Sequence, residues 1–162
     1  MSNIARTPPS PFSGNRLKFA SHQWLSDHHW TVTATLTMKD HTTEATARDD
    51  MKHFWNLLDR KAYGNAAKKK TEAAKKIKRV CLIDVGENNS NVHYHIVALT
   101  PADAKWTTDQ FTKLIDETWP TLRHAGHHNL VEPIRSVGGC IGYISAKLKY
   151  NLDQLDLDCS HF

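Results

Sequence analysis

Two histidines in one predicted strand have the spacing of a metal-binding pair. His93 and His95 are two positions apart in VHYHIVAL (residues 92–99), a run of β-branched and apolar residues typical of a strand. Side chains two apart on a strand project from the same face, so both imidazoles would point the same way. We expect that face to be turned to solvent, with Tyr94 and Ile96 facing the core. Neutral imidazole is the commonest metal ligand, so the pair could help to hold a metal ion.

An acidic residue that could complete the site lies in the preceding predicted strand, VCLIDV (residues 80–85). Asp84 interrupts this apolar run, and a buried carboxylate is costly unless a cation compensates it. The intervening GENNSN is rich in turn-forming residues and predicts a hairpin that makes the two strands neighbours. Glu87, in the turn, is the alternative ligand. The competing interpretation is that the histidines simply lie on a solvated sheet face.

A tyrosine and a lysine share one face of the last predicted helix, which we place at residues 141–151. Tyr143 and Lys147 are four positions apart, which is one helical turn. Glycines at its start would allow a close approach to another backbone. These are Gly138, Gly139 and Gly142. A packed tyrosine is the competing interpretation of this pair.

Other segments predict the elements that must position these residues. Strict alternation in WTVTATLTMK (residues 30–39) predicts a half-buried strand with its threonines on one side. Residues 46–60 have the apolar spacing of a helix, and Thr107 with Gln110 forms a capping box for another helix. A short strand over residues 130–134 contains a proline and would therefore lie at a sheet edge. The acidic tail predicts no defined element.

Positive charge gathers in one segment of the chain. The formal net charge is +4, but residues 60–79 hold nine lysines and arginines against one acid. Such an excess suits a polyanionic partner, while a solvated lysine-rich loop is the competing interpretation. The candidate binding residues are Lys61, Lys68, Lys69, Lys70, Lys75, Lys76 and Lys78.

Length and composition indicate one domain. The chain has 162 residues, of which 40% are hydrophobic. Residues 1–15 are rich in proline and serine and predict a flexible arm, so the domain would span residues 16–162. No apolar run approaches the ~18 residues of a membrane helix. The three cysteines are odd in number and lack metal-site spacing, which predicts a reducing, cytoplasmic location.

Three motifs occur in an informative order. They are the threonine-rich TATLTMK, the His93-Tyr94-His95 step preceded by Asp84-Val85-Gly86, and the tyrosine helix GYISAKLKYN. In this order they resemble the HUH endonuclease superfamily, in particular the rolling-circle replication initiators of plasmids and phages. The segment KHFWNLLDRKAYG also looks like the family's helix before the basic segment. The resemblance covers roughly residues 31–151.

The resemblance implies an α+β fold with a central antiparallel sheet of about five strands and flanking helices, the RRM-like palm of HUH endonucleases. It implies that Tyr143 attacks a phosphate of single-stranded DNA, leaving a 5′-phosphotyrosine and a free 3′-hydroxyl. His93, His95 and Asp84 would hold Mn²⁺ or Mg²⁺, and the mixed nitrogen and oxygen ligands favour Mn²⁺. Lys147 would steady the phosphate or act on the tyrosine.

The implied substrate is single-stranded DNA at a replication origin or hairpin. The DNA would cross the sheet face, with the lysines of the basic segment on its phosphates. No helicase segment follows the tyrosine helix, so a host helicase and polymerase would be the partners.

The sequence departs from the family at the tyrosine helix. Many relatives have a lysine three residues after the tyrosine, where this chain has Ala146 and then Lys147. Lys147 also stands where some relatives have a second tyrosine, which implies a single-tyrosine enzyme with Tyr150 as the rival nucleophile. Two other functions stay open: a non-catalytic nucleic-acid-binding module, and a metal-dependent nuclease that uses water.

Overall fold

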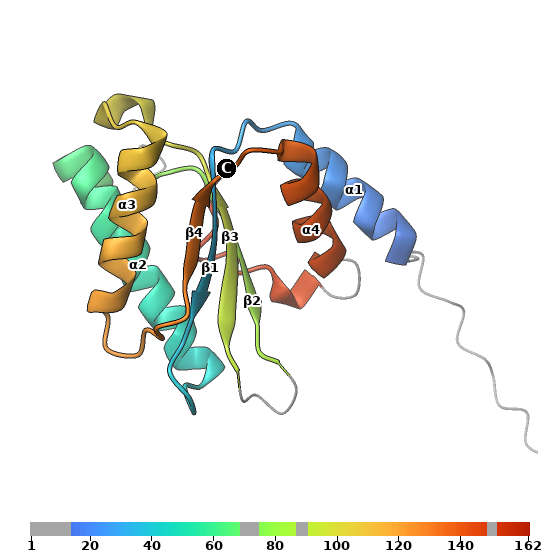
Figure 1. The fold of residues 1–162 in the computed structure, drawn as a ribbon, viewed down its shortest axis with the longest axis horizontal. Coiled ribbons are helices and arrows are strands. Elements are labelled where there is room, and N and C mark those ends of the chain that lie inside the picture. Colours follow the sequence, from blue (N-terminus) through green and yellow to red (C-terminus); the bar gives the residue numbers. More distant parts are fainter. Residues whose placement is uncertain (1–13, 69–74, 87–90, 149–151) are drawn as a thin grey trace, which may run out of the picture.

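The computed structural model describes residues 14–68, 75–86, 91–148 and 152–162. Its centre is a four-stranded antiparallel sheet in the order β2–β3–β1–β4 (Figure 1). The strands are β1 (Val32–Thr37), β2 (Arg79–Asp84), β3 (His93–Ala98) and β4 (Leu130–Pro133). The predicted α+β class is therefore confirmed, with four strands where about five were expected.

Helices cover both faces of this sheet. They are α1 (Gly14–Ser26), α2 (Glu44–Tyr63), α3 (Thr108–Thr118) and α4 (Val137–Leu148). Short 3₁₀ helices lie at Gly64–Lys68, Ala102–Ala104, Trp119–Thr121 and Leu152–Gln154. The order β1-α2-β2-β3-α3-β4 is the split βαβ arrangement, and α2 and α3 lie on the same face (Figure 1). α1 and α4 lie together on the opposite face.

The core under α2 and α3 follows from the alternation of β1. Val32, Ala34 and Leu36 are buried on this face, and the threonines between them point to the other face. Large side chains of the two helices fill the layer, and Thr107 caps α3 through the expected capping box with Gln110. The largest of these buried side chains are Met51, Phe54, Trp55, Leu58, Phe111 and Ile115.

A second core lies under α1 and α4. There Val80, Leu82 and Val97 of the sheet pack against Leu25 of α1 and three residues of α4. The α4 residues are Ile141, Ile144 and Leu148. Because both faces of β2 are covered, nearly all of its residues are buried, which explains its uninterrupted apolar run.

Helix α1 was not predicted, and it begins two residues inside the expected flexible arm. Its sequence gives little periodic signal, because Phe19 is 71% exposed while Leu25 is fully buried. Residues 1–13 of the arm lie outside the described part of the chain, so the division into an arm and one domain stays a prediction.

Helix α4 corrects two expectations. It begins at Val137 rather than residue 141, so Gly138, Gly139 and Gly142 lie inside it. The expected close approach at these glycines is wrong, since a Cβ added at Gly138 or Gly142 would meet nothing within 4 Å. The glycines instead leave this helix thin.

The three cysteines, all within the described residues, are free thiols, in agreement with the absence of a disulfide framework. None of the described helices combines the length and the apolar character needed to cross a lipid bilayer.

The glycine that does permit a close approach is Gly126, before β4. Its N–H donates to Thr37 O at 2.7 Å, and an added Cβ would contact the Thr37 side chain and lie 2.8 Å from Met38 O. We expect Gly126→Ala to lower the free energy of unfolding by about 1–3 kcal/mol, because the backbone must shift. Urea denaturation at equilibrium measures this change.

Gly142→Ala provides the contrast, since its site in α4 is open. It should raise the free energy of unfolding by about 0.5–1 kcal/mol, because alanine favours a helix interior over glycine. Equal effects of the two substitutions would contradict the packing described for Gly126.

Candidate metal centre

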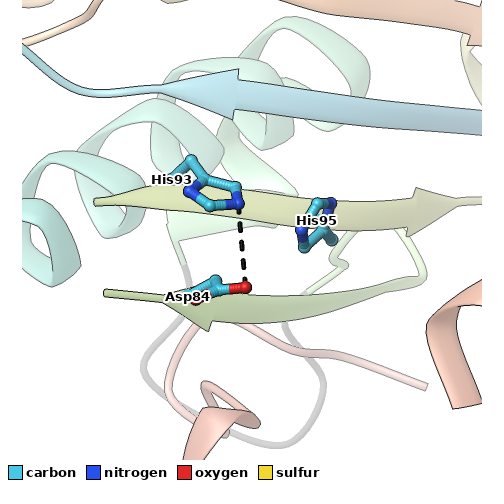
Figure 2. Close-up of side chains that lie close together, drawn as sticks. All are labelled: Asp84, His93 and His95. Carbon is cyan, nitrogen blue, oxygen red and sulfur yellow. Dashed lines mark ion pairs between the residues drawn. The ribbon is translucent and has the colours of Figure 1, made fainter. Parts of the chain in front are cut away.

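The hairpin of β2 and β3 brings the three predicted ligands together. In its register Asp84 pairs with His93, and Leu82 pairs with His95. Asp84, His93 and His95 each offer a ligand atom, and these atoms all lie within 4.8 Å of one another. Figure 2 shows the carboxylate beside the two imidazoles, with Asp84 Oδ2 3.8 Å from His93 Nε2. Such a cluster of two nitrogens and an oxygen could hold a divalent metal ion.

One atom of this cluster indicates that a ligand fits there. His95 is 4% exposed, and its Nε2 is one of two buried side-chain polar atoms in the described part of the chain without a hydrogen-bond partner. A buried polar atom without a partner is costly, and a bound cation would remove that cost. Burial, with the nearby His93 and Lys147, lowers the pKa of His95 to about 4. The imidazole is therefore in the neutral form that binds metals.

Hydrogen bonds at the other ring nitrogens orient both imidazoles. His93 Nδ1 lies 3.0 Å from Asn91 O, so it donates there and leaves Nε2 toward Asp84. His95 Nδ1 lies 3.3 Å from Thr35 Oγ1 on β1. Contacts of this kind fix the tautomer of histidine ligands in metal sites. The sequence analysis missed Thr35, although its place in the threonine row of β1 was a usable signal.

Asp84 owes its position to a glycine and a lysine. Gly86 has φ +61°, and this left-handed backbone turns its N–H back to Asp84 Oδ1 at 3.2 Å. Lys147 Nζ donates to Asp84 Oδ2 at 3.1 Å. Burial alone would raise the pKa of Asp84, but the Gly86 N–H, Lys147 and His93 together hold it below its ordinary value. The carboxylate is therefore ionised and suited to a cation.

Helix α4 places Tyr143 and Lys147 over this cluster. The Tyr143 ring meets the His95 ring edge to face, with centroids 5.3 Å apart, and Lys147 Nζ lies 5.7 Å from the tyrosine centroid. Tyr143 is 52% exposed. The expectation that both histidines face solvent is wrong for His95, because α1 and α4 cover that face of the sheet.

Several predicted residues lie elsewhere or outside the described chain. Lys69, Lys70, Glu87 and Tyr150 fall in undescribed segments. The basic segment enters β2 at Arg79, about 17 Å along the strand from Asp84 at ~3.3 Å per residue. Lys75 pairs with Asp103 at 2.8 Å and Lys76 with Asp59 at 3.4 Å, so part of the basic charge is already compensated.

The contact between Thr35 and His95 makes a prediction about metal affinity. We expect Thr35→Val to weaken Mn²⁺ binding about ten-fold, because the imidazole loses the partner that orients it. Thr35→Ser keeps the hydroxyl and should restore the affinity. Isothermal titration of the folded protein with Mn²⁺ measures these constants.

Thr33→Val is the matched control, since Thr33 lies on the same face of β1 and bonds Ile96 O instead of a candidate ligand. His95→Ala sets the level of full loss, and Glu87→Ala tests the alternative acid. Equal losses in Thr33→Val and Thr35→Val would contradict the orienting role.

One family model matches the chain over residues 31–150, and its description is that of the replication-associated protein ORF2. No curated protein and no solved structure matches significantly. The matched range contains the whole sheet, the candidate ligands, Tyr143 and Lys147. The chain belongs to this family of replication-associated proteins.

Proposed function

We propose that this protein is an HUH-type endonuclease that nicks and rejoins single-stranded DNA through Tyr143 to initiate rolling-circle replication of a plasmid or phage. The observation that carries the proposal is an exposed tyrosine ring 5.3 Å from the ring of a buried candidate ligand, His95. The family match supports a role in replication, and the sequence motifs supply the finer assignment.

The candidate ligands fit a divalent cation, of which Mn²⁺ suits the mixed donors best. When bound, such a cation supplies Lewis-acid stabilisation of the charge that develops on a phosphate oxygen. His93, His95 and Asp84 would hold it, with Asp84 already ionised and His95 already neutral. The protein would thus need no proton rearrangement at these two ligands.

Tyr143 would act as the nucleophile. Its phenolic oxygen forms a bond to phosphorus, the bond from phosphorus to the 3′ oxygen breaks, and that oxygen leaves as a 3′-hydroxyl after taking a proton. The 5′ end stays on the tyrosine. A phenolate leaves more readily than an alkoxide, so a 3′-hydroxyl can displace the tyrosine and rejoin the strand without ATP.

Lys147 would hold helix α4 and the phosphate in turn. Its ammonium bonds Asp84 Oδ2 at 3.1 Å and lies on the same side of the helix as Tyr143. A phosphate placed at the cluster would offer a second anionic partner within reach of the same flexible side chain. Lys147 thus links the position of the nucleophile to that of the ligands.

Tyr143→Phe tests the nucleophile. The ring is half exposed and is kept in the variant, so the fold and DNA binding should persist. We expect no nick and no covalent adduct with Mn²⁺ and labelled single-stranded oligonucleotides from the protein's own replicon. A denaturing gel reveals the adduct, and peptide mapping locates it.

Tyr63→Phe serves as the control, since Tyr63 ends α2 far along the chain from α4, and Tyr150→Phe tests the rival. Label on the Tyr150 peptide would move the nucleophile two turns along. Nicking by Tyr143→Phe without an adduct would show that water is the nucleophile. Metal-independent binding with no cleavage by the wild-type protein would favour a non-catalytic module.

The basic segment yields a prediction about salt dependence. Replacing Lys68, Lys69 and Lys70 with alanine should weaken binding to single strands of every sequence. The logarithmic salt slope should shrink by about 0.7 for each DNA phosphate that the variant no longer neutralises. Lys113→Ala is the control, because Lys113 is an exposed lysine on α3, across the sheet from the cluster, and pairs with Glu117. An unchanged slope in the triple variant would mean that the three lysines are only solvated surface.

A further inference from the structure

The C-terminal tail occupies the outer edge of β2. Leu155 bridges to Leu82, and His161 bridges to Arg79. Arg79 and His161 exchange two backbone hydrogen bonds, at 2.6 and 2.8 Å. The tail thus stands where a fifth strand would pair, although it forms only isolated bridges. It lies beyond residue 150, where the family match ends.

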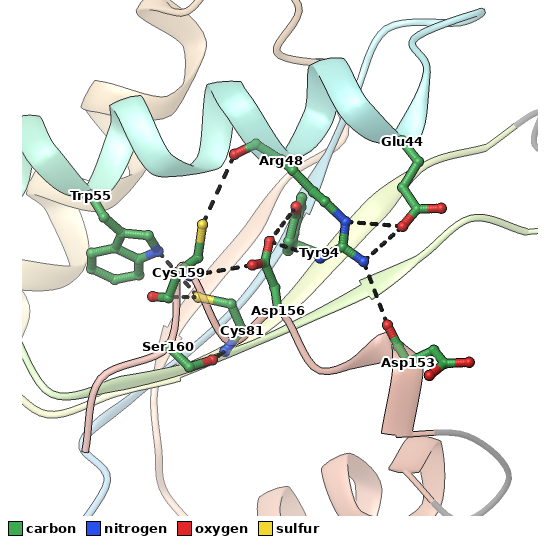
Figure 3. A network of polar contacts seen from close by, with 9 residues as sticks. All are labelled: Glu44, Arg48, Trp55, Cys81, Tyr94, Asp153, Asp156, Cys159 and Ser160. Carbon is green, nitrogen blue, oxygen red and sulfur yellow. Dashed lines mark hydrogen bonds and ion pairs between the residues drawn. The ribbon is translucent and has the colours of Figure 1, made fainter.

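One tail residue bonds both strands that carry the candidate ligands. The backbone N–H of Asp156 donates to Cys81 O of β2 at 2.9 Å. Its carboxylate accepts a hydrogen bond from the Tyr94 hydroxyl of β3 at 2.9 Å (Figure 3). Cys81 lies three residues before Asp84, and Tyr94 stands between the two histidines.

The Asp156 carboxylate is held firmly although it is buried. It is 1% exposed, and its Oδ1 accepts the Cys159 N–H at 3.2 Å. Arg48 Nη1, on α2, lies 3.4 Å from Oδ2 and compensates the charge, and Glu44 holds Arg48 from one turn away. A buried carboxylate with these partners has one stable position, since removal of any partner would leave an uncompensated charge.

This fixed carboxylate determines where Tyr94 lies. Tyr94 is fully buried on the face of β3 opposite to the histidines, and it pairs across the strands with Ile83, next to Asp84. Its hydroxyl is the donor in the bond to Asp156. A shift or rotation of β3 that moved either imidazole would have to break that bond, because the three residues are consecutive.

We propose that Asp156 and Tyr94 are positioning residues for the metal centre, through which the C-terminal tail sets the separation of His93 and His95 from Asp84. The inference rests on the proposed role of these three residues as metal ligands. The tail, outside the matched segment, thereby becomes part of what makes the centre bind tightly.

Tyr94→Phe is the test, because it removes one hydroxyl and keeps the buried ring. We expect Mn²⁺ affinity, titrated on folded protein, to fall about ten-fold, the size of a typical loss when a supporting contact of a metal site is removed. Asp156→Asn should lower it comparably. The double variant should lose no more than the larger single loss, because both changes remove the same bond.

Ser160→Ala is the matched control in the same tail. Its hydroxyl accepts the Cys81 N–H at 3.0 Å, so it anchors the tail to β2 but not to β3. It should lower the melting temperature and keep the Mn²⁺ affinity. Wild-type affinity in Tyr94→Phe, or an equal loss of affinity in Ser160→Ala, would overturn the positioning role.

Adduct formation by the same proteins separates this inference from the proposed function. Wild-type protein that binds Mn²⁺ but forms no adduct would overturn the transesterase and leave the positioning result to stand by its own titration. An adduct on Tyr143, with Mn²⁺ affinity indifferent to Tyr94→Phe, would overturn the positioning role alone. Wild-type protein that binds no Mn²⁺ would overturn the metal centre and the positioning role with it.

Discussion

The register of β2 on β3 is the constraint on which the candidate site depends. It sets Asp84 opposite His93 and so makes one cluster from residues nine positions apart along the chain. Side chains alternate along a strand, so a slip of one residue would turn both imidazoles into the core and Tyr94 out of it. The slip is costly because Tyr94, Ile96 and Ile83 are all buried under α2 and α3. The apolar core on one face therefore determines the chemistry on the other.

The Asp84–Lys147 ion pair connects this cluster to helix α4. The carboxylate sits among apolar neighbours on β2, where it needs compensation, and the lysine supplies it at 3.1 Å. The same contact places Tyr143 one turn away, against His95. A ligand at the buried Nε2 of His95 has to pass the groups that cover it, and the Tyr143 ring is among them. The nucleophile and the candidate ligands are thus parts of one packed arrangement.

Local patterns in the sequence were enough to predict most of the sheet. Alternation identified β1, the turn-rich GENNSN indicated the β2–β3 hairpin, and Thr107 with Gln110 gave the start of α3. The grouping of His93, His95 and Asp84 followed from strand geometry alone. What the sequence left open depends on long-range packing: α1 has no clean apolar stripe, α4 extends through its glycines, and the tail bonds β2 one residue at a time. The cover over His95 could not be foreseen, because it is made by two of these elements.

The segments outside the family match alter the surroundings of the site rather than its chemistry. The matched residues 31–150 supply the candidate ligands, the tyrosine and the lysine. α1 precedes that range and packs against α4, the helix that carries Tyr143. The tail follows it and bonds β2 and β3 from the opposite face through Asp156. Both additions press on elements that hold site residues, one from above the cluster and one from beneath it. Their effect is therefore to restrict how far the nucleophile and the ligand strands can move, which is the property that a centre built from two strands and a helix cannot secure by its own contacts.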